Sequence, residues 1–393
     1  MLTVALAILT GVSFVLTFWR WRAACRFPLH RRRAAPGSLP GLTLLKPLKG
    51  CDGATADCLR SWFLQEYPGP VQLLLGVADA NDPVCAVARE LVASFPGVDA
   101  RLVVCRDSLG ANAKVSTLRQ LEPHIRHGLV MISDADVKVS ADFAANVAPL
   151  LADPEVGLVN CFYRLANPST AAMQWEAVAI NADFWTQVLQ SRSLRAVDFG
   201  LGAVMTLPAA RLKEMGGFRA LTDFLADDYQ LGQQVASQRK RIEFASVVAE
   251  CWDAPLGWGG VWTHQCRWAR TIRVCDPAPY FFSLLNNATL WPVLLALAAR
   301  SPAALGAAGV CLVFRAGTAL QQQARLTESR THLDSWWLAF VKDLLDVAVW
   351  ASAFCGNEIA WRGERYRILS DGRLERVFPP RNTQSNAEGF GVK

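Results

Sequence analysis

The segment that decides the fold reads Leu129-Val-Met-Ile-Ser-Asp-Ala-Asp136. Its first five residues form a short apolar run, which is typical of a buried strand in a parallel sheet. Asp134 and Asp136 follow this run directly. Because such sheets bind ligands at the carboxyl ends of their strands, we expect the two carboxylates to line a binding crevice. A lone D-x-D pair can equally be a solvated turn, and its position after the apolar run is what favours a site.

Apolar runs continue to alternate with helical patterns from Leu42 to about Asp253, which predicts an α/β domain. Strands are predicted at 42–45, 72–78, 100–105, 129–133 and 157–162, and helices at 54–65, 83–94, 118–124 and 141–151. Because helices separate the strands, we expect a parallel sheet with right-handed crossovers.

The composition indicates a membrane protein. Of the 393 residues, 52% are hydrophobic and only 19% are charged, whereas soluble chains carry about 25% charged residues. This balance argues against intrinsic disorder and against a freely soluble enzyme. Met1–Trp19 carries no charge and is long enough to cross a hydrocarbon core of ~30 Å. Arginines follow this segment instead of preceding it, which indicates an anchor with a cytoplasmic basic flank and not a cleaved signal peptide.

Three further apolar segments lie towards the C-terminus. They are Tyr280–Ala299, Pro302–Leu320 and Ser335–Cys355. Arg315 interrupts the second segment. The third contains Lys342, Asp343 and Asp346, so it is either a span or a helix in the membrane interface. Three spans would place the Arg-rich stretch Arg362–Arg381 outside, against the positive-inside rule, whereas two spans and an interfacial helix would keep it inside.

These patterns divide the chain into six regions. They are a transmembrane anchor (1–19), a basic juxtamembrane linker (20–41), the α/β domain (42–253), an interfacial segment (254–278), C-terminal membrane helices (279–360) and a polar tail (361–393). The net charge of +6 comes with arginines beside the apolar segments, which fits lipid headgroups better than nucleic acid. The eleven cysteines include no Cys-x-x-Cys pair, which predicts a reduced, cytosolic domain without disulfides or a zinc site.

Other polar residues follow predicted strands or begin predicted helices. Asp79 follows the second strand, and Gly110-Ala-Asn-Ala-Lys114 comes after the third, as a surface turn or as a loop lining a nucleotide pocket. Asp228 lies at the start of a helical pattern over 229–238, where it is either a helix cap or a general base. The absence of Gly-x-Gly-x-x-Gly and of a Gly-Lys-Ser/Thr loop excludes dinucleotide and P-loop sites.

A last group of polar and aromatic residues lies within 252–273. Arg267, Arg270 and Arg273 are spaced by three, so they share roughly one face of a helix, and Trp252, Trp258, Trp262 and Trp268 occur in the same stretch. Such a helix can lie in the membrane interface. It can also hold a diphosphate and a nonpolar acceptor at the lip of a site.

In this order, the residues resemble a known family. Asp79, Asp134-Ala-Asp136, Asp228 and Arg267-Trp268 resemble the D…DxD…D…(Q/R)xxRW set of inverting, family-2-like glycosyltransferases. More narrowly, the chain is similar to glycosyltransferase family 21, which includes ceramide glucosyltransferases and bacterial enzymes of hopanoid glycosylation. Its opening strand, third-strand entry and C-terminal stretch are also similar. These are 44–50 (LLKPLKG), 98–102 (VDARL) and 361–367 (WRGERYR).

The resemblance implies a GT-A fold for 42–253 and a role for each matching residue. Asp79 would contact the uracil or ribose of a UDP-sugar, with Pro47 and Lys114 also in the nucleotide-sugar site. Asp134 and Asp136 would hold the nucleotide-sugar and a divalent metal, Mg²⁺ or Mn²⁺. Asp228 would be the general base, and Arg267 and Trp268 would close over the diphosphate and acceptor. His264 departs from the pattern where Gln or Arg is expected. With Arg270 it remains a candidate contact of the acceptor or diphosphate.

The expected activity is transfer of one sugar, glucose from UDP-glucose, to a lipid hydroxyl such as that of ceramide at the cytoplasmic face. The expected partners are therefore a UDP-sugar, a lipid acceptor and the membrane, with no nucleic acid. One alternative is transfer of N-acetylglucosamine from its UDP-sugar to a hopanoid polyol. A processive polysaccharide synthase would need more spans than three imperfect segments supply. From another class, the chain could be a non-catalytic membrane scaffold.

Overall fold

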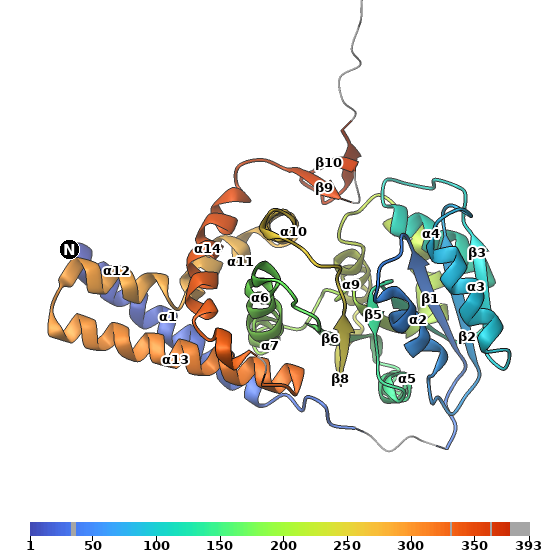
Figure 1. The fold of residues 1–393 in the computed structure, drawn as a ribbon, viewed down its shortest axis with the longest axis horizontal. Helices are drawn as coiled ribbons and strands as arrows, with labels where there is room; N and C mark the ends of the chain where they lie inside the picture. The colour runs from blue at the N-terminus through green and yellow to red at the C-terminus, as the bar shows by residue number, and fades with distance from the viewer. Residues whose placement is uncertain (33–36, 331, 362–363, 378–393) are drawn as a thin grey trace, which may run out of the picture.

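The computed structural model describes residues 1–32, 37–330, 332–361 and 364–377 (Figure 1). An eight-stranded sheet in the order β3-β2-β1-β4-β7-β6-β8-β5 forms the centre of the α/β domain. Its strands are β1 (Leu42–Leu48), β2 (Val71–Val77), β3 (Asp99–Val104), β4 (Leu129–Ser133), β5 (Val137–Lys138), β6 (Val156–Leu165), β7 (Val204–Pro208) and β8 (Arg241–Cys251). The helices of this domain are α2 (Thr55–Phe63), α3 (Val84–Ser94), α4 (Ala113–Leu121), α5 (Phe143–Val147), α6 (Ala171–Val178), α7 (Trp185–Arg192), α8 (Ala209–Glu214) and α9 (Asp227–Ser237). Short 3₁₀ turns cover Glu122–His124, Ala148–Ala152 and Gly217–Leu221, and Ala179–Phe184 is π-helical.

The predicted strand at 129–133 is confirmed at both ends as β4, and it pairs in parallel with β1, which pairs in parallel with β2 on its other side. β7 differs from the prediction of a parallel sheet, because it runs antiparallel between β4 and β6. No strand was predicted between 162 and Asp253, although α6, a π-helical segment and α7 precede β7 in the chain. The helix predicted at 118–124 begins earlier, at Ala113, because the Asn112 side chain caps it by accepting from the Lys114 and Val115 amides at 3.0 and 3.2 Å.

Alternating side chains of the central strands build a core on each face of the sheet. Leu42 and Leu44 pack in one apolar cluster with α2, α3 and α5. Leu45, on the opposite face, packs with α4, α7 and α9. Both faces are therefore covered, as a doubly wound sheet requires, and the carboxyl ends of β1, β2 and β4 remain as the edge where polar residues gather.

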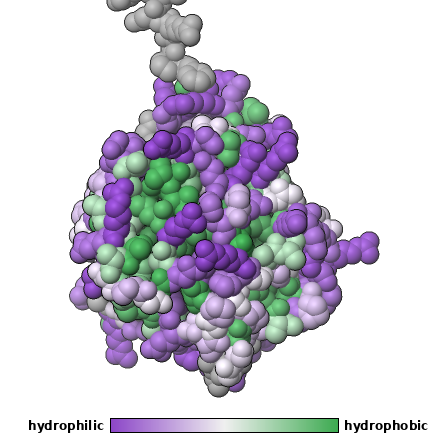
Figure 2. All heavy atoms as spheres, turned by 90° about the vertical axis from the view of Figure 1, so that its right-hand side faces the viewer, coloured by the Kyte–Doolittle hydropathy of each residue, from purple (hydrophilic) through white to green (hydrophobic). Residues whose placement is uncertain are grey.

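Three helices protrude side by side from the α/β domain in Figure 1: α1 (Leu2–Cys25), α12 (Leu290–Ala299) and α13 (Pro302–Thr327). Of the described helices, α1 and α13 are each long and apolar enough to cross a membrane. A third crossing is possible by length if Pro277–Asn286 and Leu290–Ala299, which meet at 50°, form one span. Val4, Ile8, Val310 and Val313 are all more than 60% exposed on α1 and α13. By contrast, Figure 2 shows the end of the molecule beyond α3, where hydrophilic residues surround the apolar patches.

The segment predicted at 335–355 forms α14 (Leu338–Ser352), which packs against α6 and against α10 (Trp258–Cys275). This region also contains one short helix, α11 (Pro277–Phe282), and two 3₁₀ turns, at Ser283–Asn286 and Leu333–Ser335. At 15 residues, α14 is shorter than a span. Its Lys342 and Asp343 are buried. This arrangement favours the alternative with two C-terminal spans over the one with three.

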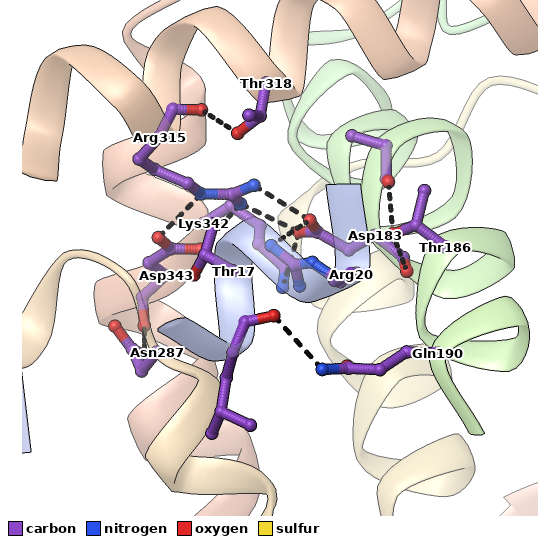
Figure 3. Close-up of polar contacts among 12 residues, drawn as sticks. Thr17, Arg20, Asp183, Thr186, Gln190, Asn287, Arg315, Thr318, Lys342 and Asp343 are labelled. Carbon is purple, nitrogen blue, oxygen red and sulfur yellow. Dashed lines mark hydrogen bonds and ion pairs between the residues drawn. The ribbon is translucent and has the colours of Figure 1, made fainter. Parts of the chain in front are cut away.

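A buried ionic cluster explains the charges inside the apolar segments (Figure 3). The Arg315 guanidinium donates to both oxygens of Asp183 at 2.8 Å and to Asp343 at 2.7 and 2.9 Å. Arg20 and Lys342 also contact Asp183, at 3.3 and 3.0 Å. Each of these buried charges therefore has an opposite partner, which offsets the cost of burying it. The ion pairs also join α1, α13 and α14 to the π-helical segment of the α/β domain, which carries Asp183.

Residues 358–376 form a small antiparallel sheet, which includes the described part of the region predicted as a polar tail (361–393). Its strands are β9 (Glu358–Trp361), β10 (Glu364–Ile368) and β11 (Leu374–Arg376). Tyr366 and Ile368 alternate with arginines, and their buried side chains pack on Leu225 of the α/β domain. The sheet therefore lies on the same side of any membrane as that domain, which requires an even number of crossings between them. Residues 33–36, 362–363 and 378–393 of the predicted linker, C-terminal motif and tail lie outside the described residues.

Candidate functional site

The turn that carries Asp134 and Asp136 is held from below by Lys46 of β1. The Lys46 side chain is fully buried, and its ammonium donates to Ser133 Oγ at 3.3 Å, to the Asp134 carbonyl oxygen and to the Val137 carbonyl oxygen at 3.4 Å. The same ammonium lies 5.0 Å from the centre of the Trp62 ring. Both ends of the turn are thus attached to one cation. Sequence reasoning missed Lys46, although a lysine within an apolar strand was a signal that could have found it.

Lys114 joins the Asp134 turn to the start of α9. Its ammonium lies 2.7 Å from Asp134 Oδ1 and 3.3 Å from Asp227 Oδ2. Burial by itself would lower the pKa of Lys114, but the two carboxylates outweigh burial and raise that pKa above its ordinary value. The predicted nucleotide-site residue Lys114 therefore stands between two acidic segments that are 93 positions apart in the chain, Asp134 and Asp227.

Asp228 occupies the first turn of α9, where the Tyr229 amide donates to its Oδ1 at 2.8 Å. Burial raises the pKa of Asp228 to about 6, with Asp227 adding to the effect and Lys114 opposing it. A Cβ on Gly202 would lie 3.0 Å from Asp228 Oδ2, so the loop before β7 approaches this carboxylate closely. A carboxylate that loses its proton near pH 6 is suited to accept one from a hydroxyl group at neutral pH.

The carboxylate of Asp136 is suited to bind a metal cation. Burial raises its pKa to about 7, and the negative charges of Asp134 and Asp253 contribute to the rise. The charge of Lys46 opposes this rise in the pKa of Asp136. Carboxylate oxygens are hard ligands, so Asp134 and Asp136 fit a Mg²⁺ or Mn²⁺ ion. No group of three or more His, Cys, Asp or Glu side chains suited to a metal occurs in the described parts of the chain, so the fit requires further oxygens from a diphosphate or water.

The segment predicted to be interfacial contains α10, which bears His264, Arg267, Trp268 and Arg270. His264 Nδ1 and Gln265 Nε2 both lie 2.8 Å from Oε1 of Glu176, whose side chain is fully buried on α6. The His264 ring packs edge-on against Trp268, with 4.5 Å between the ring centres. Glu176 therefore fixes the face of α10 that carries the Arg-Trp motif. Sequence reasoning missed it, because nothing local marks one glutamate of an apolar helix.

Arg270 lies on another part of α10. Its Nη1 donates to the carbonyl oxygen of Glu358 at 2.7 Å, and Arg273 contacts the Asn357 side chain. These two arginines therefore attach α10 to the C-terminal sheet. Sequence reasoning also missed Asp253, whose carboxylate interacts electrostatically with His264 and Arg267. Burial raises the pKa of Asp253, while the charges of His264 and Arg267 oppose that rise.

Asp79 and Pro47 lie apart from this group. Asp79 is exposed at the carboxyl end of β2 and accepts from the Asn81 amide at 2.9 Å. β1 separates β2 from β4, so Asp79 is about 10 Å or more from Asp134 across two strand spacings. Pro47 is paired with Gly76 on the intervening strand. The structure thus brings together Lys114, Asp134, Asp136 and Asp228, and it leaves Asp79 at the outer end of the same sheet edge.

Comparison with known proteins finds relatives along most of the chain. Residues 2–374 match the family described as Glycosyl transferase family 21. The ceramide glucosyltransferase of Candida albicans is 32% identical over 117 residues, which cover 27% of this chain and 22% of that protein. Ceramide glucosyltransferase 3 of Caenorhabditis elegans is 22% identical over 247 residues, covering 62% and 53%. The beta-monoglucosyldiacylglycerol synthase of Trichormus variabilis is 23% identical over 261 residues, covering 66% and 54%. The chain thus spans between about a fifth and about half of the length of these relatives.

A solved structure shares the fold. The mannosyltransferase PcManGT from Pyrobaculum calidifontis, in complex with GDP-Man and Mn²⁺, matches with a TM-score of 0.53 and 21% sequence identity. The match covers 90% of this chain and 96% of that chain. The predicted fold class is confirmed: an α/β domain of GT-A type with a mostly parallel sheet, together with helices suited to a membrane at both ends.

Proposed function

The chain belongs to glycosyltransferase family 21, and from this premise we propose that it transfers one glucose from UDP-glucose to the hydroxyl of a ceramide. The observation that carries the proposal is the position of Asp228, a carboxylate with a raised pKa, beside the Lys114 bridge to the Asp134–Asp136 turn. A base, an anion-binding edge and apolar helices for a lipid thus occur in one chain. The similarity to ceramide glucosyltransferases supports the choice of donor and acceptor.

The proposed reaction is a single displacement with inversion. Asp228 accepts the proton of the acceptor hydroxyl. At the same time the hydroxyl oxygen bonds to the anomeric carbon, and the bond from that carbon to the UDP oxygen breaks. Asp134 and Asp136 would hold a divalent ion, Mg²⁺ or Mn²⁺, which when bound neutralises charge on the diphosphate. Lys114 holds Asp134 in place, while Arg267 and Trp268 of α10 close over the diphosphate and acceptor, with His264 beside them. Asp79 and Pro47 hold the nucleoside.

The site is proposed to face the cytoplasm. Arg20, Arg22 and Arg26 lie at the end of α1 that joins the α/β domain, whereas Arg300 is the single arginine between α12 and α13 at the far end (Figure 1). This asymmetry follows the positive-inside rule. Two crossings between the α/β domain and the C-terminal sheet satisfy the requirement that both lie on one side.

A second acceptor class has support from one relative. The similarity to a beta-monoglucosyldiacylglycerol synthase extends over 66% of the chain, so a diacylglycerol hydroxyl is the second candidate. Transfer of N-acetylglucosamine to a hopanoid polyol has no comparable observation in its favour. A non-catalytic scaffold would not need to keep Lys114 in contact with both Asp134 and Asp227, the neighbour of Asp228, and this argues against that alternative.

The direct test measures product with defined lipids. Purified protein in nanodiscs is supplied with Mn²⁺, UDP-glucose or UDP-N-acetylglucosamine, and ceramide, diacylglycerol or a hopanoid polyol, and the lipids are analysed by mass spectrometry. Glucosylceramide as the main product supports the proposal. Formation of glucosyldiacylglycerol or of a hopanoid product would show that the acceptor is that lipid and not ceramide. No transfer from either donor to any lipid would favour the non-catalytic scaffold.

Replacing Asp136 by Asn is expected to weaken Mn²⁺ binding on the order of tenfold or more, because an amide lacks the charge that a hard cation requires. Binding is measured by electron paramagnetic resonance of free Mn²⁺, in the presence of UDP, without any need for turnover. Asp153→Asn is the matched control, because Asp153 is an exposed carboxylate paired with Arg241 far from the turn. Equal Mn²⁺ binding in the Asp136 variant and the control would contradict the metal assignment.

The pH dependence of turnover follows from the pKa of Asp228, which is raised to about 6. The base acts only as a carboxylate, so kcat/KM should be constant at neutral pH and fall about tenfold for each unit below pH 6. The profile is recorded from pH 5 to 8 at saturating Mn²⁺, which keeps Asp136 ionised. Thermal melting at each pH is the control for unfolding. A constant kcat/KM down to pH 5 would show that a group other than Asp228 takes the proton.

A further inference from the structure

The C-terminal sheet touches the segment that leads to the general base. The Leu374 amide donates to the Asp223 carbonyl oxygen at 2.7 Å, and the Leu225 amide donates to the Gly372 carbonyl oxygen at 3.4 Å. Phe224 and Arg373 form an antiparallel bridge between these bonds, with the Arg373 guanidinium 5.7 Å from the centre of the Phe224 ring. Residues 223–225 thus pair with the sheet almost as a further strand, three positions before Asp228.

The same segment is tied to the loop that precedes Lys114. The Asn112 amide donates to the Thr222 carbonyl oxygen at 2.8 Å, and its side-chain amide donates to the Phe224 carbonyl oxygen at 2.8 Å. The Ala111 amide donates to the Asp223 side chain at 3.1 Å. Since Asn112 also caps α4, one residue fixes both Lys114 and the backbone before Asp228. Displacing residues 222–225 would therefore move both Lys114 and its partner Asp227.

The other edge of the sheet holds α10. Arg270 reaches the backbone of Glu358 at the start of β9, and Arg273 reaches the Asn357 side chain. Arg267 and Trp268 lie one turn earlier on the same helix. Figure 1 shows β9 and β10 above α10 and close to the loop that leads to α9. The sheet is thus in contact with two segments that are remote in sequence, each of which bears part of the site.

We propose that the C-terminal sheet, β9–β11, is a strap that positions the segment before Asp228 and the Arg-Trp helix α10 relative to each other. The inference rests on the proposed function for the roles of Asp228 and Arg267. The strap supplies no reacting group. Its buried residues, Ile359, Tyr366, Ile368 and Leu374, form an apolar cluster with Leu225. This cluster is separate from the two cores of the α/β domain, so its loss should displace the two attached segments without unfolding the sheet of eight strands.

Two substitutions in the full-length chain detach the strap by different means. Ile368→Glu places an unpaired charge in a cluster where Ile368 is 1% exposed. Gly372→Val puts a β-branched residue at a φ of +86°, which disrupts the turn that offers its carbonyl to Leu225. Arg365→Ala is the matched control, because its side chain on β10 is 74% exposed.

The expected result in both variants is a local change. Hydrogen exchange should quicken in residues 222–228 and in α10 but stay unchanged in β1, β2 and β4. We expect kcat to fall about 100-fold, as displacement of a base by about 1 Å can cause. The KM for the donor should rise, because α10 carries Arg267 and Trp268, whereas the melting temperature changes little. Faster exchange throughout the domain, or wild-type kcat with a detached strap, would overturn the proposal. Because exchange needs no turnover, a full-length chain without activity on any lipid would refute the proposed function and leave the strap testable.

Discussion

Asp228→Asn should lower the kcat of sugar transfer by about 1,000-fold, since loss of a positioned general base removes between about 100-fold and 10,000-fold of rate. The asparagine side chain has the size and shape of the aspartate side chain. Its oxygen can still accept the hydrogen bond that the Tyr229 backbone N–H donates to Asp228 at 2.8 Å. The fold and the donor site should therefore be preserved. The measurement is UDP release with lipid acceptor and Mn²⁺, together with the dissociation constant of UDP.

The appropriate control for this substitution is Asp99→Asn. Asp99 is an exposed carboxylate on β3 that pairs with Arg126 at 2.9 Å, so its loss should leave turnover close to that of the wild type. UDP affinity should be unchanged in both variants. If Asp228→Asn turns over at the wild-type rate, Asp228 is not the base. If UDP affinity falls as much as kcat, the carboxylate acts in donor binding instead.

Asp183→Asn should have the largest effect on folding. Asp183 contacts Arg20, Arg315 and Lys342 in the buried cluster of Figure 3, and its side chain is 3% exposed. The amide would leave these three cations without their common anion. Removing one partner from a buried ion pair costs about 3–5 kcal/mol. We therefore expect little folded protein after extraction into detergent, measured by size-exclusion chromatography and thermal melting.

Two further variants test whether charge is the cause. Asp183→Asn combined with Lys342→Met removes one cation along with the anion, and it should recover part of the lost stability. Asp346→Asn should be milder, because Asp346 is 32% exposed and contacts only Lys342 within the cluster. Equal loss in all three variants would contradict the role of Asp183 as the shared partner. Full stability of Asp183→Asn alone would contradict the importance of the cluster.

The sequence predicted most of the first half of the sheet because the signal there is local. The strand at 129–133 is apolar at consecutive positions, and β1 and β2 differ from their predicted bounds by three residues at most. The family resemblance added the order of Asp79, Asp134, Asp228 and Arg267-Trp268, and the family is confirmed. The roles assigned to these residues stay predictions that the variants above address.

The partners of those residues could not be predicted in the same way. In the sequence, Lys114 is one residue of a predicted polar loop. Its position between Asp134 and Asp227 results from the folding of the chain. Glu176 reads as one charge in an apolar helix until α10 presents His264 and Gln265 to it. The strands at 364–376 are too short and too charged to stand out, because their apolar positions are balanced by exposed arginines.

By itself, the sequence determined which segments are apolar enough for a membrane, where the strands before the acidic residues lie, and which family the chain resembles. These properties depend on residue type and on spacing over at most a few turns. Only the tertiary structure decided that α14 lies against the α/β domain, that Arg315 is neutralised by Asp183, and that the C-terminal strands reach the segment before Asp228. The physical reason is that each of these contacts joins residues more than a hundred positions apart, and their energy appears only when packing removes water from between them.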